Sequence, residues 1–304
     1  MTATLRPATY NLYRRRALTG VILTLPALAA LAATMLYPIA WTLWISLNGK
    51  NYALSGKPAF VGPANYLRVV ANADFLDALL HTLGFVLAAL LIEAAIALPI
   101  ALALHRGLRG TKIFQAAVAM PLMVAPVVGA LAWRWMFVSG YGMIDSIMSR
   151  FGGHGPLWFA DIWLARMAIV ITNLWLALPF DVLMLVAGLA SLPSEPLEAA
   201  LVDGASPMQT LRLVTLPLLR PVVAIILVIR LADAFRIFDV VYVLTGSGPG
   251  NSTDVLSTFI YRQMFFKFDF AGGSAASILL VAITALASLA VVAALRRRSA
   301  GTMS

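Results

Sequence analysis

Six long apolar runs constrain the fold of this chain more than any other feature. Only a helix satisfies its own backbone hydrogen bonds in hydrocarbon, and it needs about 20 apolar residues to cross. Six runs reach that length, at residues 17–47, 79–104, 113–138, 166–190, 214–235 and 275–295. They predict an all-α integral membrane protein with six transmembrane helices.

The first run has a second interpretation, as a cleaved signal peptide. It follows three arginines at 14–16, and its alanine-rich stretch at 27–33 offers small residues for cleavage. However, the apolar run continues past Trp41 and Trp44, which is too long for a signal-peptide core of about 7 to 15 residues. We therefore predict an uncleaved first span.

The composition agrees with a membrane location and excludes several kinds of site. Only 12% of the 304 residues are charged, against about 25% in soluble domains. The absence of cysteine excludes disulfides, cysteine-bound zinc, iron–sulfur clusters and thiol nucleophiles. The histidines, His81, His105 and His154, are too scattered to suggest a metal site.

The positions of the cations predict the orientation, because lysine and arginine gather in cytoplasmic loops. With the N-terminus inside, twelve cations face the cytoplasm: Arg6, Arg14, Arg15, Arg16, Arg106, Arg109, Lys112, Arg212, Arg220, Arg296, Arg297 and Arg298. We predict cytoplasmic ends at 1–16 and 296–304 around a transmembrane domain at 17–295. The net charge of +9 follows from this bias, so no nucleic-acid partner is predicted.

The cytoplasmic loop at 191–217 is predicted to form two short helices joined by a sharp turn. Ser194 is a suitable N-cap for the first helix, and Asp203-Gly204 is a suitable stop because glycine adopts positive φ readily. Ser206, Pro207 and Gln209 have the spacing of a capping box with proline at the first helical position. We call this loop the elbow.

The elbow has an apolar face that no lipid would cover, made by Leu197, Ala200, Leu201, Leu211 and Val214. A partner protein could cover this face. Alternatively, the loop could be a capped connection that packs against the chain's own helix ends. Local physical chemistry leaves both interpretations open.

The sequence of the elbow resembles the EAA signature of binding-protein-dependent ABC importer permeases. That pattern is EAA, three residues, Gly, nine residues, Ile, one residue and Leu-Pro. Here Glu198-Ala199-Ala200, Gly204 and Leu216-Pro217 match it, and Val214 replaces Ile. The resemblance implies a type I importer permease in which the elbow is a coupling helix that docks on a cytoplasmic ATPase through Glu198, Ala199, Ala200, Asp203 and Gly204.

The resemblance also implies the partners of this chain. These are a second permease subunit, two cytoplasmic ATPase subunits and an extracytoplasmic substrate-binding protein, assembled in the bacterial inner membrane. The chain has no P-loop, which would need Gly-x-x-x-x-Gly-Lys-Ser/Thr to hold phosphates. We therefore expect ATP and Mg²⁺ on partner chains, no cofactor on this chain, and no catalysis by it.

A few ionisable residues fall within the predicted spans, where they are expensive and often functional. They are His81, Glu93, Arg134, Asp181, Arg230 and Asp233. Arg230, Asp233, Arg236 and Asp239 recur every three residues, as in a helical stripe of alternating charge. The stripe could neutralise itself, or part of it could line a polar cavity for a sugar.

Similarity to maltose-type permeases suggests which residues line the substrate pathway. The segment Asn173–Phe180 precedes the elbow as in that family, and Leu244-Thr245 with Gly248-Pro249 resembles its Leu-Thr-x-Gly-Gly-Pro stretch. By this match the pathway residues are Asn173, Leu176, Ala177, Phe180, Arg230, Asp233, Ala234 and Ile237. The maltose-type pattern has small polar or aromatic groups at the positions of Arg230 and Asp233, and the segment 233–245 looks closer to trehalose-type permeases.

The predicted function is therefore carbohydrate uptake, of a disaccharide or a related sugar. Two alternatives remain open. A related importer could instead take up a glycerophosphodiester or a polyol, and for the charged glycerophosphodiester it would use Arg230, Arg236 and Arg134 to bind the anion. A stand-alone channel or secondary transporter would use Glu93 or Asp181 as a proton site.

Overall fold

The computed structural model describes residues 8–50, 59–107, 110–153 and 155–300. The predictions that concern residues 1–7, 51–58, 108–109, 154 and 301–304, among them those for Arg6, Arg109 and His154, lie outside this part. The described chain is helical, and its only β-type pairing is a single bridge between Asn48 and Phe60. Within this part the predicted all-α fold is confirmed.

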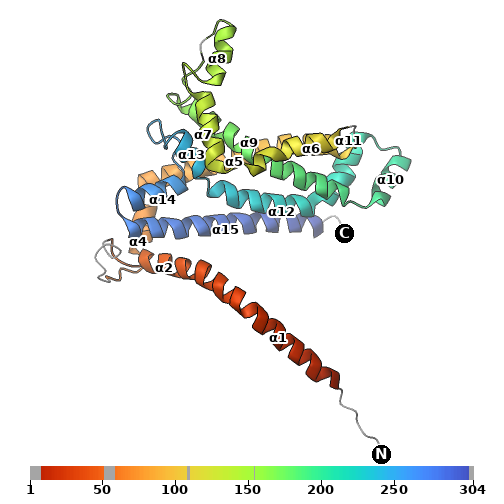
Figure 1. Ribbon diagram of the computed structural model, residues 1–304, viewed down its shortest axis with the longest axis horizontal. Coiled ribbons are helices and arrows are strands. Elements are labelled where there is room, and N and C mark those ends of the chain that lie inside the picture. The colour runs from red at the N-terminus through yellow and green to blue at the C-terminus, as the bar shows by residue number, and fades with distance from the viewer. Residues whose placement is uncertain (1–7, 51–58, 108–109, 154, 301–304) are drawn as a thin grey trace, which may run out of the picture.

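Four long helices form the body of the molecule (Figure 1). They are α5 (Ala73–His105), α9 (Ile162–Ala190), α12 (Leu216–Phe235) and α15 (Phe270–Ala300). α9 and α12 both pack against α5, and α15 packs against the other side of α12. Four apolar cores between these helices and their neighbours hold the bundle together.

Five helices in the described residues are long and apolar enough to span a membrane, and a bent pair makes six if it counts as one span. The bent pair is the third predicted span. α6 (Thr111–Ala119) and the short 3₁₀ turn Met120–Met123 are followed by α7 (Pro126–Phe137), and the axis turns by 99° at the break. The prediction of one continuous helix over 113–138 is therefore wrong.

The break has a local cause. Val124 is extended, and Pro126 starts α7 at a position where its missing N–H has no consequence. Such a proline cannot continue the preceding helix, because it has no N–H to donate. The residues on both sides of the break are apolar, so the hydropathy pattern alone does not reveal the break.

The first span is interrupted more gently. α1 (Ala8–Leu31) passes through a π-helical stretch at Ala32–Leu36 into α2 (Tyr37–Ser46). Pro38 follows this stretch, and a proline leaves the carbonyl four residues earlier without its usual donor. α2 packs against α15, whereas α1 extends away from the bundle (Figure 1).

The fifth span begins earlier than predicted. α11 (Pro207–Thr210), a π-helical stretch at Leu211–Thr215 and α12 form one continuous helical path from Pro207 to Phe235. The second helix of the elbow is thus the start of a transmembrane helix.

The segments between the spans at the end opposite the elbow also contain helices. They are α4 (Ala64–Val70), α8 (Met143–Arg150), α13 (Asp239–Leu244) and α14 (Leu256–Phe265). α14 and α4 pack on α15, and α13 packs on α7. Within the described residues these regions contain helices and turns.

Replacement of Gly188 should separate α9 from α12. A Cβ at this position would lie 2.8 Å from one Val222 methyl and 3.2 Å from Leu219 Cδ2, so Gly188→Val overpacks the contact. We expect a loss of about 1–3 kcal/mol, seen as a lower unfolding temperature in detergent. Gly84→Val is the matched control, because a Cβ there meets nothing within 4 Å. Equal unfolding temperatures for Gly188→Val and the wild type would contradict this packing.

Candidate functional site

A cluster of buried charges joins three transmembrane helices. Arg230 of α12 donates to both carboxylate oxygens of Glu93 on α5, from Nη2 to Oε1 at 2.8 Å and from Nε to Oε2 at 3.1 Å. Asp181 of α9 lies 3.6 Å from Arg230 Nε. Glu93 and Arg230 are only 2% and 7% exposed, so this bidentate pair is shielded from solvent. We call Glu93, Asp181 and Arg230 the ion cluster.

Two further polar side chains extend the ion cluster. Asn173 Nδ2 of α9 donates to Glu93 Oε1 at 3.0 Å. Asp233 Oδ2 lies 3.5 Å from Arg230 Nη1, and its other oxygen accepts from Arg236 Nη2 at 2.6 Å. Carboxylates therefore outnumber guanidinium groups around Arg230.

The predicted stripe of alternating charge exists only in part. α12 ends at Phe235, Arg236 is the residue at its C-cap, and Asp239 begins α13 after the chain has turned. The stripe therefore does not continue to Asp239. The shortest contacts of Arg230 are to Glu93 on another helix, 137 residues earlier in the chain, and not to Asp233.

A small cavity of about 180 Å³ adjoins the ion cluster. Glu93, Asp181 and Arg230 contribute to its wall, and the rest of the lining is apolar. Asp181 Oδ1 is buried and accepts no hydrogen bond from the described residues, so its nearest favourable contact is the ion pair with Arg230. The cavity therefore combines an apolar wall with one carboxylate oxygen, Asp181 Oδ1, that accepts no hydrogen bond from the described residues.

The eight predicted pathway residues differ in how accessible they are within this chain. Ala177, Arg230, Ala234 and Ile237 are buried. Asn173, Leu176, Phe180 and Asp233 are half-buried, and the Asp233 side chain is 37% exposed. Leu176 faces α7, since a Cβ at Gly129 would lie 2.9 Å from its Cδ2. The structure thus brings Asn173 and Asp233 together through the ion cluster and leaves Phe180 as a half-buried aromatic on the same helix as Asn173.

The elbow forms a separate site at one end of the bundle. α10 (Ser194–Val202) ends at Asp203, and Gly204 follows with φ of 76°, a conformation that residues with a side chain rarely adopt. Ser206 accepts from the Gln209 backbone N–H, and Gln209 Oε1 accepts from the Ser206 backbone N–H at 2.7 Å. The predicted turn and capping box are confirmed.

Two details of the elbow differ from the prediction. Pro193 occupies the N-cap position and Ser194 is the first helical residue, without a side-chain capping bond. The proline before Ser194 moves the helix start by one residue. Among the predicted apolar residues only Leu201 is exposed, while Leu197, Ala200, Leu211 and Val214 are half-buried.

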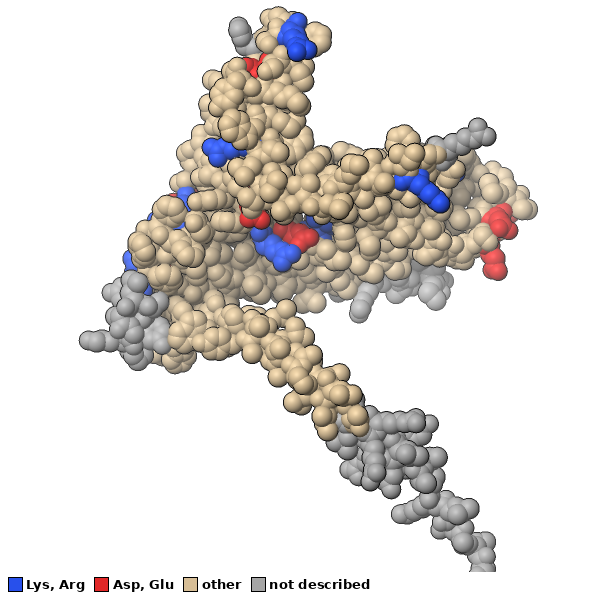
Figure 2. Space-filling view, viewed as in Figure 1, with Lys and Arg blue, Asp and Glu red and all other residues tan. Residues whose placement is uncertain are grey.

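The exposed surface of the elbow combines acidic and apolar side chains. Glu198, Ala199, Asp203 and Gly204 are exposed. Leu201, Val202, Met208 and Leu213 are large apolar residues with 55–88% of their surface exposed. Figure 2 shows the acidic side chains that gather at this end of an otherwise weakly charged face. The elbow is at the same end of the bundle as the end of α15, as the predicted topology requires (Figure 1).

Comparison with known proteins identifies the family. Residues 95–300, which include the ion cluster from Asp181 onward and the whole elbow, match the family "binding-protein-dependent transport system inner membrane component". The chain belongs to this family. It is therefore an integral membrane protein and a transport component, and the resemblance carried by the EAA letters is confirmed.

Individual relatives cover nearly all of the chain. It is 37% identical over 271 residues to the trehalose/maltose transport system permease protein MalF of Thermococcus litoralis, covering 89% of this chain and 91% of that protein. It is 34% identical to the trehalose transport system permease protein SugA of Mycobacterium tuberculosis, covering 87% and 84%. A crystal structure of a bacterial alginate ABC transporter with a pentasaccharide-bound periplasmic protein has a chain of the same fold, with a TM-score of 0.81 at 22% identity and coverage of 95% and 98%.

The pairing of Glu93 with Arg230 is the feature of the site that sequence reasoning missed. Both residues stand out as ionisable groups within predicted spans. A useful signal was available, because such groups almost always pair with one another. The sequence does not say which acid meets which base, since the partners lie on helices that are separate in the chain.

Removal of the Arg230 charge should destabilise the protein. Arg230→Met leaves Glu93 and Asp181 buried without a cation, and breaking a buried pair in this way costs about 3–5 kcal/mol. We expect a marked fall in the unfolding temperature of the purified chain in detergent. Arg236→Met is the matched control, because Arg236 pairs with Asp233 but is 76% exposed, and exposed pairs contribute about 0–1 kcal/mol. Similar effects of the two variants would contradict a buried ion cluster.

Proposed function

We propose that this chain is a transmembrane subunit of an ATP-driven importer that takes up a carbohydrate, such as a disaccharide, delivered by an extracytoplasmic binding protein. The names of the two relatives above carry this proposal, because both belong to trehalose or trehalose/maltose permeases that align with nearly the whole chain. A second, related permease would complete the translocation path.

The elbow would be the contact with the cytoplasmic ATPases, which bind ATP and Mg²⁺. Its exposed Glu198, Asp203 and apolar residues form a surface suited to a protein cleft, and Gly204 permits the turn that presents them. Ala199 and Ala200 are small enough to allow close approach. Because the elbow continues into α12, movement of the docked ATPases would tilt the helix that carries Arg230.

The sugar pathway would run past the half-buried polar and aromatic groups on α9 and α12. Asn173 and Asp233 provide amide and carboxylate groups that bind hydroxyls, and Phe180 provides an apolar face for a sugar ring. The buried Ala177, Ala234 and Ile237 would shape this wall from behind, together with Leu176. Arg230 would orient Glu93 and Asn173, because its own donors already point at carboxylates.

The ion cluster makes an anionic substrate a weaker candidate. An anion clamp needs a guanidinium group with free donors, and Arg230 is shared by Glu93, Asp181 and Asp233. Arg236 is paired with Asp233 as well. Glycerophosphodiesters would therefore meet more negative than positive charge here, whereas a neutral sugar or polyol would not be repelled. The membership in a binding-protein-dependent family also disfavours a stand-alone carrier.

Disruption of the elbow should release the ATPase. We expect a P-loop ATPase to co-purify with the wild-type chain from solubilised membranes and to be lost with Glu198→Lys or Gly204→Pro. Glu195→Lys is the matched control, since it makes the same charge change at an exposed residue of the same helix. Full recovery of the ATPase with both elbow variants would overturn the docking role.

Truncation of the aromatic ring on α9 should reduce sugar uptake while the complex stays assembled. Phe180→Ala removes the apolar face, so we expect uptake of labelled trehalose or maltose by cells to fall about tenfold, as for a loss of about 1.4 kcal/mol. ATPase recovery should be unchanged. Phe265→Ala in α14 is the control, because this exposed ring lies outside the proposed path. Equal uptake by the two variants would exclude Phe180 from the path.

A further inference from the structure

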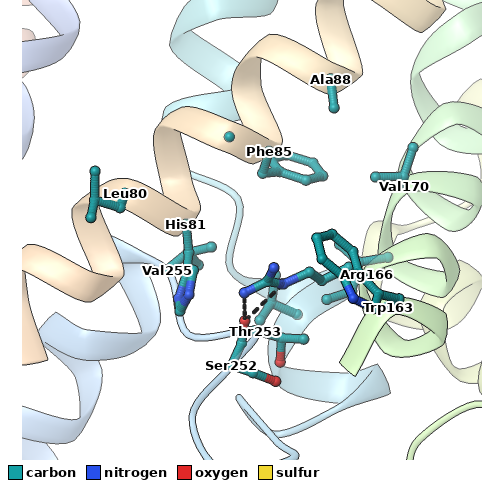
Figure 3. Close-up of a pocket in the computed structure, with 13 residues that line it drawn as sticks. Leu80, His81, Phe85, Ala88, Trp163, Arg166, Val170, Ser252, Thr253 and Val255 are labelled. Atoms are coloured by element: carbon teal, nitrogen blue, oxygen red, sulfur yellow. Dashed lines mark hydrogen bonds between the residues drawn. The ribbon is translucent and has the colours of Figure 1, made fainter. Parts of the chain in front are cut away.

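A second cavity lies far from the elbow, between the first turns of α5 and α9 and the loop before α14. It encloses about 280 Å³ and its lining is mainly apolar, with Phe85, Ala88, Ile169 and Val170 among the contributors. Figure 3 shows Phe85 and Val170 facing this space from opposite helices. Its rim includes Leu80 and Trp163, which are 64% and 70% exposed. An apolar chain could therefore enter from the side of the bundle.

One end of this apolar cavity is cationic. Arg166 Nε and Nη2 donate to the Ser252 carbonyl oxygen at 3.1 and 2.9 Å, and the guanidinium carbon lies 5.1 Å from the centre of the Trp163 ring (Figure 3). These contacts hold the guanidinium group in place and leave its Nη1 donors unused by the described residues. Tryptophan is enriched at the level where lipid headgroups meet the protein.

A polar cavity of about 220 Å³ adjoins the same end. His81 and Ser252 line both cavities, and Asp74, Asp77, Asp254 and Arg262 contribute to the polar one. Asp254 is paired with Arg262, and Asp74 lies 3.5 Å from Lys267. Asp77 has no ion pair within the described residues, and the buried Ser252 hydroxyl has no hydrogen-bond partner there. The polar cavity thus offers one exposed carboxylate, that of Asp77, without an ion pair.

From this arrangement we propose that the two cavities form a binding site for one phosphatidylethanolamine molecule. Part of an acyl chain occupies the apolar cavity, the phosphate binds Arg166, and the ammonium group binds Asp77. The order of groups along the site, apolar, cationic and then acidic, matches the order of groups in this lipid.

The same arrangement discriminates against other common lipids. Phosphatidylglycerol carries the phosphate without an amine, so its headgroup would leave Asp77 without an ion pair. Phosphatidylcholine has a quaternary ammonium without N–H donors, so it cannot donate a hydrogen bond to Asp77. The proposal therefore predicts a preference for the primary amine.

The site can be blocked at Gly84, which lines the apolar cavity. A Cβ there meets no atom within 4 Å, so the side chain of Gly84→Leu has room to begin and should extend into the cavity. The measurement is native mass spectrometry of the full chain, purified with its associated subunits, after addition of each of the three lipids at equal concentration. We expect the wild type to retain phosphatidylethanolamine about tenfold better than either other lipid, and Gly84→Leu to lose this retention.

Variants of the polar groups separate headgroup recognition from simple hydrophobic adhesion. Arg166→Gln should weaken retention of phosphatidylethanolamine about tenfold, and Asp77→Asn should remove the preference over phosphatidylglycerol. Arg134→Gln is the control, because Arg134 also donates to a backbone carbonyl, that of Val243 at 2.7 Å, but does not line the cavities. Unchanged lipid retention in Gly84→Leu, or equal effects of Arg166→Gln and Arg134→Gln, would overturn the proposal.

A labelling experiment tests whether a protein, and not a lipid, occupies the apolar cavity. Because the chain has no cysteine, Gly84→Cys creates a single site for a thiol-linked photo-crosslinker. Adducts with phospholipid in native membranes would support the proposal. Adducts with a second permease subunit in place of lipid would overturn it.

Discussion

The cost of burying charge among apolar helices is the constraint on which the structure depends. Arg230 meets this cost by binding Glu93 with two hydrogen bonds and by lying close to Asp181, so one guanidinium group joins α5, α9 and α12. Isolated charges in a medium of low dielectric constant are unstable. If α5, α9 and α12 were not neighbours, each would carry an unpaired charge. The ion cluster therefore specifies which helices are neighbours more sharply than apolar packing does.

Apolar packing surrounds the ion cluster on α5. Toward the elbow, Ala97 and Ala101 belong to a core shared with α9 and α12, and in the other direction Val86 packs with α12 residues. Small residues at these positions allow close helix contact, as Gly188 does where α9 meets α12. The buried charges thus lie between two apolar cores of the bundle.

The continuity of the elbow with α12 connects the two sites. Gly204 turns the chain, the Ser206 capping box starts the next helix, and that helix runs without a break to Phe235. A displacement of the elbow would therefore reach the ion cluster along one continuous helical path, which includes the π-helical stretch at Leu211–Thr215. In the proposed importer, this is the physical basis for coupling between ATPase closure and rearrangement of the bundle, because both states must differ in their contacts with the ligand and the partner.

Much of this could be read from the sequence, because the features concerned are local. Apolar runs of sufficient length determined the helical membrane fold, and Asp203-Gly204 with Ser206, Pro207 and Gln209 determined the turn of the elbow, since caps and turns depend on residues a few positions apart. Only the tertiary structure decided that the third run bends by 99° and that Arg230 pairs with Glu93 in preference to Asp233. The physical reason is that a hydropathy pattern shows which residues are apolar, but it does not show where a helix bends or which helix it packs against. A partner 137 residues away is selected by helix packing and by the shared need of two buried charges for each other.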